Sequence, residues 1–329
     1  MLLTGTSDIA VNITGYYDQV LLVRAVPELF YGMYGDIKPL PANSGTRINF
    51  RSYDPLAVAT TPLTEGSVGS GKKAVTSDIY ATIQQYGDYV LYSDLVKMTA
   101  PDAILTEIQE LQAEQLGRTI DILNRDTLVA GTAVRYAAGV SARTSLATAI
   151  AKVDVQSAIR TLQASNAKFL RRMVVAGDKT GVRPIASAYV ALGHTDCQAD
   201  YEDLPGFTKV EEYASQKDRL PGEIGALLNV RFCTSTHGKI WLAGGAAVGT
   251  TGCVASDSTT TDAYATLVFA EHAYATIPMQ KLTVKSIIKK LGYKDELDLV
   301  GSAGWKTAHA VKITNEDFMV RVEHLVTDL

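Results

Sequence analysis

The feature that most constrains this chain is a pair of strand-like segments joined by a long stretch with no periodic pattern. The first segment, Arg47–Tyr53, alternates apolar and polar residues, and the second, Asp78–Tyr92, is rich in Tyr, Ile and Thr, which suit a pleated strand. Residues 54–77 between them are mostly Pro, Thr, Gly, Ser and Ala. The pattern predicts a long antiparallel hairpin with an extended tip across residues 46–94. Because an isolated hairpin is only marginally stable in water, it needs a surface on which to lie.

The segment before the hairpin, residues 1–45, is predicted to be an arm. A short helical pattern covers Tyr17–Val26 and ends at Pro27. Glycine and proline then recur too often for a long element, at Gly32, Gly35, Pro39, Pro41 and Gly45. Such a segment buries little surface by itself. We therefore expect residues 1–94 to become ordered against copies of the same chain rather than against their own core.

A long helix is the clearest element that follows. Thr99–Asp102 combines a Thr cap, a Pro just inside the helix and an acid at the positive end of the helix dipole. The helix is predicted across about residues 100–130 and ends before Gly131; about 30 residues make about 45 Å of helix. Its apolar residues recur at helical spacing: Ile104, Leu105, Ile108, Leu111, Leu116, Ile120, Leu123 and Leu128.

Shorter elements make up the rest of the chain. A second helix is predicted across Asp154–Ser165, and a stretch of Gly, Ala, Thr and Ser covers residues 244–262. Strands are predicted at residues 171–176, 229–233, 239–242, 264–269 and 318–323. This mixture of separate helices and strands predicts an α+β fold.

The charge balance limits the possible partners. Charged residues make up 20% of the chain, below the usual quarter, which favours burial against partner chains. A net charge of −4 excludes a protein that condenses nucleic acid through bulk positive charge. Cys197, Cys233 and Cys253 match neither a disulfide framework nor a zinc pattern, and unpaired cysteines suit a reducing cytoplasm. We find no signal-peptide pattern and no apolar run long enough to span a membrane.

Two local patterns resemble ligand-binding motifs, and each lacks an essential part. Gly66–Lys73 nearly matches a phosphate-binding loop, but Lys73 replaces the required Ser or Thr and a strand pattern follows where a helix is needed. His194 and Cys197, with Asp200 nearby, supply too few ligands for a zinc site. We predict no catalytic residue, no cofactor and no metal, and therefore no enzyme.

Four motifs, in this order, carry a resemblance to a known family: Asp54-Pro-Leu-Ala-Val-Ala-Thr-Thr-Pro-Leu-Thr-Glu-Gly66; Gln85-Tyr-Gly-Asp-Tyr-Val90 with Ser93-Asp94; Gly222-Glu-Ile-Gly225 with Val230-Arg-Phe232; and Gly304-Trp-Lys306. With these motifs the chain resembles the major capsid proteins of tailed bacteriophages, in particular those of the N-four-like podophages. The resemblance covers nearly the whole chain and implies the Hong Kong 97-like capsid fold. The stretch at residues 244–262 departs from the family pattern.

The resemblance implies a division into five segments. They are an N-terminal arm (1–45), an extended hairpin or E-loop (46–94), a peripheral domain with a spine helix at about 100–130 (95–184), an axial domain (185–285) and return strands of the peripheral domain (286–329). The implied function is that of a structural subunit of an icosahedral phage head, assembled in the host cytoplasm as hexamers and pentamers around double-stranded DNA. The implied partners are copies of itself and DNA that is bound weakly and without sequence preference. Whether cement, scaffolding and portal proteins are also partners stays open, and no contact with a membrane is implied.

Charged residues of the hairpin are the candidate inter-subunit contacts: Arg47, Arg51, Glu65, Lys72 and Lys73. At the tip, Lys72 and Lys73 could reach an acidic patch or an Asn of a neighbouring subunit, and a covalent link is one form of that contact. The alternative is that both lysines are ordinary solvated charges. Three alternatives remain open from the sequence. They are an encapsulin-type compartment shell, a nucleotide-dependent enzyme that uses the Gly-rich loop before Lys72, and a decoration protein.

Overall fold

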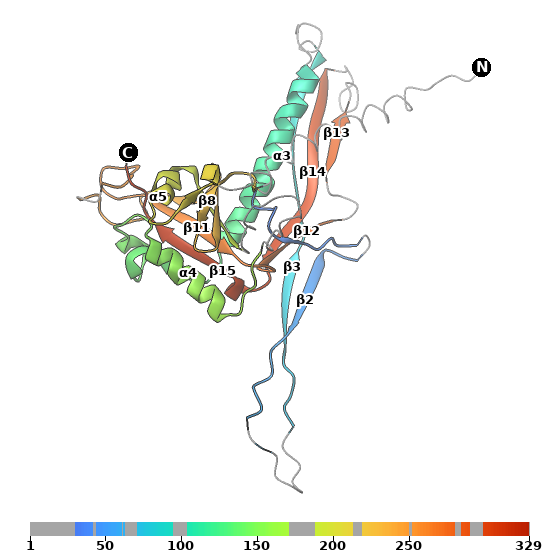
Figure 1. The fold of residues 1–329 in the computed structure, drawn as a ribbon. Coiled ribbons are helices and arrows are strands. Elements are labelled where there is room, and N and C mark those ends of the chain that lie inside the picture. Colours follow the sequence, from blue (N-terminus) through green and yellow to red (C-terminus); the bar gives the residue numbers. More distant parts are fainter. Residues whose placement is uncertain are drawn as a thin grey trace, which may run out of the picture.

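The computed structural model describes residues 30–41, 44–60, 62, 71–94, 104–170, 188–212, 219–249, 252–279, 284–289 and 299–328. These residues form two β-sheets, one on each side of the view in Figure 1, and a two-stranded hairpin that extends away from both. A long helix lies along the smaller sheet. The described residues therefore have the α+β architecture that the sequence predicts.

The larger sheet, here called the axial sheet, has its strands in the order β5-β15-β11-β6-β9-β8-β7, with β10 paired to β11. Its strands are β5 (Val134–Tyr136), β6 (Tyr189–His194), β7 (Thr208–Lys209), β8 (Glu223–Leu227), β9 (Val230–Ser235), β10 (Ile240–Trp241), β11 (Ala263–Phe269) and β15 (Met319–His324). All residues of the central strand β11 are buried. Helix α4 (Lys152–Ala164) packs on the sheet through Val155, Ala158, Ile159 and Leu162 and completes the main core.

Short helical turns connect the strands of this body. They are η2 (Ala137–Gly139), η3 (Arg143–Ser145), η4 (Thr195–Cys197), α5 (Gln198–Glu202), η5 (Val210–Glu212) and η6 (Glu316–Phe318). Tyr201 of α5 is fully buried and its hydroxyl lies 2.5 Å from Thr266 Oγ1 in β11, which fastens this turn to the sheet.

The smaller sheet, here called the peripheral sheet, is built around β14. It runs β1-β12-β14-β13, and β4 also pairs with β14. Its strands are β1 (Asp36–Ile37), β4 (Gln84–Ser93), β12 (Tyr274–Pro278), β13 (Lys285–Lys289) and β14 (Val300–Ile313). Helix α3 (Ile104–Val129) lies along β14 (Figure 1). Its 26 residues correspond to about 39 Å.

The predicted long helix is confirmed over its described residues, but its buried face is more polar than predicted. Leu111 is 64% exposed, whereas Gln112, Asp121 and Asn124 are buried. The side chain of Gln112 donates to the Ala303 carbonyl in β14 at 2.7 Å, so the helix is held to the sheet partly by hydrogen bonds. Periodicity of apolar residues alone did not indicate this contact, because the partner is far away in the sequence.

The two sheets divide the chain differently from the predicted segments. Strand β15, inside the predicted return segment 286–329, lies between β5 and β11 in the axial sheet. Within the predicted peripheral segment 95–184, β5 and α4 belong to the axial body. Conversely, β12, inside the predicted axial segment 185–285, pairs with β14 of the peripheral sheet. Long-range strand pairing sets these positions, and local patterns do not report it.

The predicted second strand of the hairpin is in fact two strands. Residues 76–82 form β3 (Thr76–Thr82), which pairs with β2 (Arg47–Tyr53) as predicted. After Ile83 the chain enters β4, which pairs with β14 instead. The hairpin is therefore shorter than the 46–94 prediction, because its second half is part of the peripheral sheet.

The described end of the arm packs on its own chain. Tyr31 is buried, its backbone N–H donates to Asp121 in α3 at 2.6 Å, and its carbonyl accepts from the Tyr274 hydroxyl at 2.5 Å. Strand β1 adds in parallel to β12. The expectation that all of residues 1–94 lack a core of their own is thus wrong for residues 30–41 and for β4.

Some predictions fall on residues that the structure does not describe. They are the helical pattern Tyr17–Val26, the helix start Thr99–Asp102, the strand at 171–176 and the contact residue Glu65.

Candidate assembly interface

Among the described residues, the contacts that anchor the hairpin of β2 and β3 are at its base. There Ile48 and Phe50 pack with the buried Ala81 and Ile83 on residues of the peripheral sheet. The two strands run antiparallel from the pair Arg47↔Thr82 outwards. Away from the base they lie beside no other part of the described chain (Figure 1). The predicted hairpin is therefore confirmed for β2 and β3, and the need of its outer part for an external surface stays a prediction.

Apolar side chains face solvent in this outer part. All described residues of 54–60 and 71–75 are exposed. They include Leu56, Val75 and Val58, the last of which is 83% exposed. Exposed apolar groups on an extended element, without a core beneath them, are typical of a surface that a partner covers.

The charged candidate residues stiffen the hairpin. Arg51 forms two hydrogen bonds to the Asp78 carboxylate across the strands, at 2.9 and 3.1 Å. This bonding lowers the pKa of Asp78. The Arg47 guanidinium stacks 3.8 Å from the centre of the Tyr80 ring. Both arginines are thus engaged within the hairpin and hold its two strands in register.

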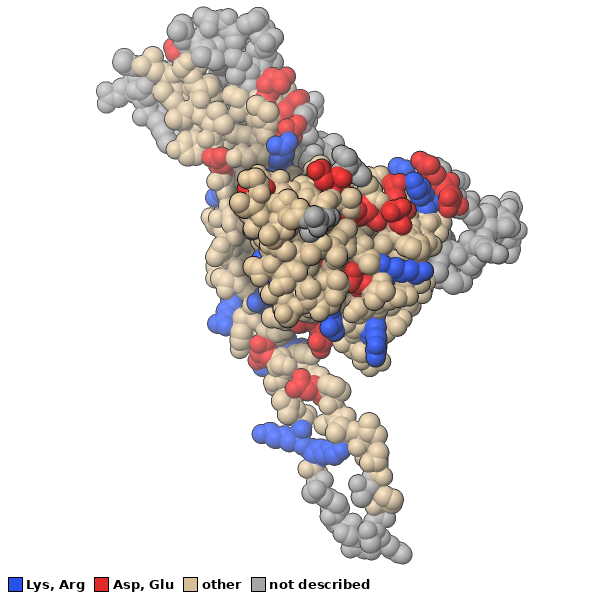
Figure 2. Space-filling view, turned by 90° about the vertical axis from the view of Figure 1, so that its left-hand side faces the viewer, with Lys and Arg blue, Asp and Glu red and all other residues tan. Residues whose placement is uncertain are grey.

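The lysines lie further out. Lys72 Nζ donates to the Ala57 carbonyl at 2.8 Å, a neutral partner that leaves its charge uncompensated. Lys73 is exposed, and no ion pair of it occurs within the described residues. Figure 2 shows mixed acidic and basic side chains over the face it displays, and a basic group partway along the hairpin. These two lysines remain predicted contact residues.

The near-match to a phosphate-binding loop is not supported by its surroundings. The described part of the motif, residues 71–73, is extended and leads into strand β3. A phosphate-binding loop needs a helix N-terminus at this position, where backbone N–H groups meet the phosphates.

The His194 region is part of the axial body. His194 Nδ1 lies 3.1 Å from Asp196, and Asp200 accepts a hydrogen bond from the Thr327 backbone at 3.0 Å. Cys197 is fully buried, and burial raises the pKa of its thiol to about 12. Within the described residues, no group of three or more His, Cys, Asp and Glu is placed to hold a metal ion.

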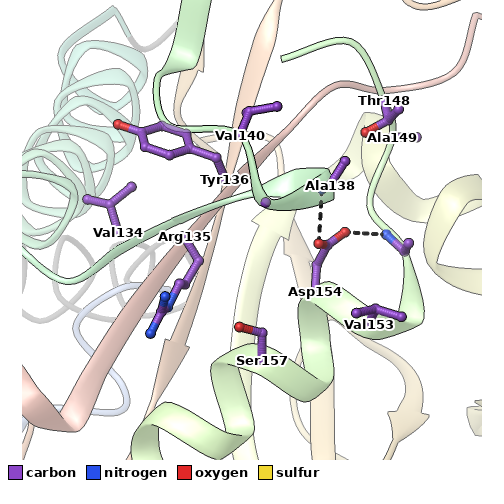
Figure 3. Close-up of a pocket in the computed structure, with 12 residues that line it drawn as sticks. Val134, Arg135, Tyr136, Ala138, Val140, Thr148, Ala149, Val153, Asp154 and Ser157 are labelled. Atoms are coloured by element: carbon purple, nitrogen blue, oxygen red, sulfur yellow. Dashed lines mark hydrogen bonds between the residues drawn. The ribbon is translucent and has the colours of Figure 1, made fainter. Parts of the chain in front are cut away.

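A pocket of about 530 Å³ lies between β5 and the start of α4 (Figure 3). The one carboxylate in its lining, Asp154, accepts from the backbone N–H groups of Ala151 and Ala138, at 2.9 and 3.1 Å. Asp154 therefore caps α4 and ties the η2 turn to it. Because both bonds occupy the carboxylate oxygens, the arrangement favours a structural role.

One surface was missed by the sequence analysis. In β4, Tyr89, Val90 and Leu91 are all exposed, although strand alternation would bury every second one. The signal was present as an unbroken apolar triplet in a strand. The sequence prediction assigns these residues to the hairpin and does not single out the triplet.

Among the described helices, none is both long and apolar enough to cross a membrane.

Comparison with solved structures identifies the fold. The capsid of Ralstonia phage GP4 superposes with a TM-score of 0.64 at 12% identity, over 91% of this chain and 89% of that chain. Cyanophage Pam1 capsid gives 0.59 at 12% identity, over 92% of each chain. A chain of Mycobacterium phage Che8 gives 0.55 at 14% identity, over 89% of this chain and 90% of that one. No protein-family model matches the chain, and no curated sequence matches it.

These likenesses extend over nearly the whole of both chains, so they concern the complete architecture and not one shared sheet. The fold is that of tailed-phage capsid subunits, the Hong Kong 97-like fold, and this prediction is confirmed. The narrower resemblance to N-four-like podophages stays a prediction.

Proposed function

We propose that this chain is the major structural subunit of an icosahedral bacteriophage head. It assembles with copies of itself into hexamers and pentamers that enclose double-stranded DNA. The observation that carries the proposal is the combination of a capsid-subunit fold with a hairpin that leaves its own body (Figure 1).

The hairpin supplies a physical mechanism for assembly. A hairpin that is marginally stable alone becomes ordered when a neighbouring copy covers its exposed apolar residues. Closed symmetry then repeats the same contact around the ring and over the shell. In this arrangement the axial body lies at the centre of each capsomer, and the peripheral sheet lies at the rim.

The charge balance suits a container for DNA. A chain with a net charge of −4 has no bulk attraction for phosphate, so it holds packaged DNA weakly and without sequence preference. The subunit acts by contact and not by catalysis. We therefore expect Lys72→Ala to change particle stability at most, and to abolish no enzymatic activity.

Electron microscopy of the expressed chain tests the proposal. Negative-stain images are expected to show capsomers, tubes, sheets or shells. A clean monomer near 35.3 kDa under all assembly conditions would contradict it. Nucleic acid inside virion-derived particles supports a phage head, whereas an enclosed enzyme would indicate an encapsulin-type compartment.

A further inference from the structure

Strand β4 has an unusually open edge. It pairs on one side with β14, without a bulge, from Gln84↔His309 to Ser93↔Val300. No other described strand lies on its outer side. Natural edge strands are usually protected by lysine, proline, a bulge or shortness. The 10 residues of β4 include none of these protective features, and Asp88 is the one charged residue among them.

The middle of this strand is exposed to solvent. Gly87–Leu91 are five consecutive exposed residues. Tyr89, Val90 and Leu91 are 62%, 42% and 55% exposed. Because successive side chains of a strand point to opposite faces, exposure of all three leaves apolar surface on both faces. One face is in partial contact with α3, since Gln115 donates to the Asp88 carboxylate at 2.6 Å. Such an apolar, regular edge is suited to pairing with another strand.

The backbone of Tyr89 faces this open side. In an antiparallel ladder, alternate residues turn their N–H and C=O groups towards the partner strand and the others turn them outwards. Asp94 N–H donates to the Leu299 carbonyl at 3.1 Å, so residues of its parity face β14. Tyr89 has the opposite parity, and its N–H donates to the Asp88 carboxylate at 2.8 Å. An incoming strand has to displace the Asp88 carboxylate from this N–H, and the other oxygen of that carboxylate can keep its hydrogen bond from Gln115.

We propose that β4 pairs antiparallel with β4 of a second copy, about a two-fold axis at Tyr89; this rests on the proposed function. In this register Tyr89 meets its own equivalent, Leu91 lies opposite Gly87, and Val90 lies opposite Asp88. The bulky leucine meets the residue without a side chain, and two aromatic rings meet at the axis. The strand is thus complementary in size to itself.

The position of β4 agrees with this pairing. Copies within a ring meet head to tail through two different surfaces, whereas copies related by a two-fold axis present the same surface to each other. In the proposed shell the peripheral sheet lies at the rim of the ring, where rings meet. Five residues bury far less than the roughly 1,200 Å² of a stable interface, so the pair forms within the shell and not as a free dimer.

Disulfide trapping in assembled particles tests the register. Tyr89→Cys places two thiols at the axis, with Cα atoms about 5.5 Å apart, inside the range that a disulfide spans. Val90→Cys is the matched control, because its equivalents are displaced by two positions and lie roughly 8–9 Å apart, beyond that range. The native Cys197, Cys233 and Cys253 are buried and form no disulfide, so they compete little.

On mild oxidation we expect most Tyr89→Cys chains to run as linked dimers on a non-reducing gel, and Val90→Cys chains to remain monomers. Equal linkage of both variants, or unlinked Tyr89→Cys in well-formed particles, would overturn the pairing. If Tyr89→Cys does not assemble, hydrogen exchange on the unaltered particle decides. Protection of the Gly87, Tyr89 and Leu91 amides that appears on assembly supports the pairing, and unchanged exchange overturns it. Absence of particles from the unaltered chain would instead refute the proposed function.

Discussion

The axial body and the hairpin are built on opposite principles within one chain. In the axial body, β11 is buried along its whole length, and α4 covers the sheet with apolar residues. In the hairpin, a two-stranded ribbon carries exposed apolar residues such as Val58, with polar contacts such as Arg51–Asp78 holding its strands together. The first region supplies its own solvent-free core, and the second has only one layer.

This difference separates two kinds of stability. The free energy of folding of a single subunit resides in the axial body and the peripheral sheet, because they bury apolar area without help. On the proposed function, the hairpin contributes to stability only when another copy covers it. Substitutions in the two regions should therefore affect two different measurements: unfolding of the subunit, and formation of particles.

The largest expected effect is in the axial core. Phe232 is 1% exposed and its ring lies 4.9 Å from the ring of Tyr201 and 5.9 Å from that of Phe207. Phe232→Ala leaves a cavity among these rings, so we expect the free energy of unfolding to fall by about 3–5 kcal/mol. Urea unfolding of the unassembled subunit measures it. A loss below about 1 kcal/mol, the size of an ordinary substitution, would mean that this core is not the stable part.

The same contrast explains what the sequence could predict. Strand β2 and the helix α3 were predicted near their observed positions, because alternation and helical spacing are local properties. The placement of β15 in the axial sheet was not predicted, since its partners β5 and β11 lie far away in the sequence.

Polar residues of the α3–β14 contact were missed for a similar reason. Asn124 was not in the predicted apolar face, yet it is buried because its side chain meets His309 at 2.8 Å. The candidate interface shows the same limit. The charged hairpin residues can be identified from composition. The fold alone shows that Arg51 pairs with Asp78 and that Tyr89 lies on an open strand edge.

A second effect, of intermediate size, concerns acid. His309 lies under α3 in the peripheral sheet, and burial lowers its pKa to about 4. The unfolded chain has a histidine pKa near 6.5, so between about pH 6.5 and 4 the unfolded state binds a proton that the folded state does not. Stability should therefore fall as the pH falls through this window, by at most about 3 kcal/mol from this group.

The unfolding free energy of the subunit measured from pH 7 to pH 4 checks this effect. His309→Gln can keep a donor to Asn124 and should reduce the slope in that window. A slope remains from His324, whose pKa is also lowered by burial. An identical slope in the unaltered chain and in His309→Gln would show that His309 does not drive the acid sensitivity.

The smallest effect on the subunit is predicted for the hairpin, and there the two measurements should separate. Leu56 and Val58 are exposed, so the double substitution Leu56→Ser and Val58→Ser should change the free energy of unfolding by no more than about 0.5 kcal/mol. Particle formation, measured by sedimentation and electron microscopy, should nevertheless be lost or strongly reduced, because a neighbouring copy loses the apolar surface it covers. Val153→Ser, at a valine of α4 that is 69% exposed, is the control and should leave both measurements unchanged. Normal particles from the double variant would show that the hairpin does not join the copies. The distinction between a body that is stable by itself and a hairpin that depends on a neighbouring copy would then be wrong.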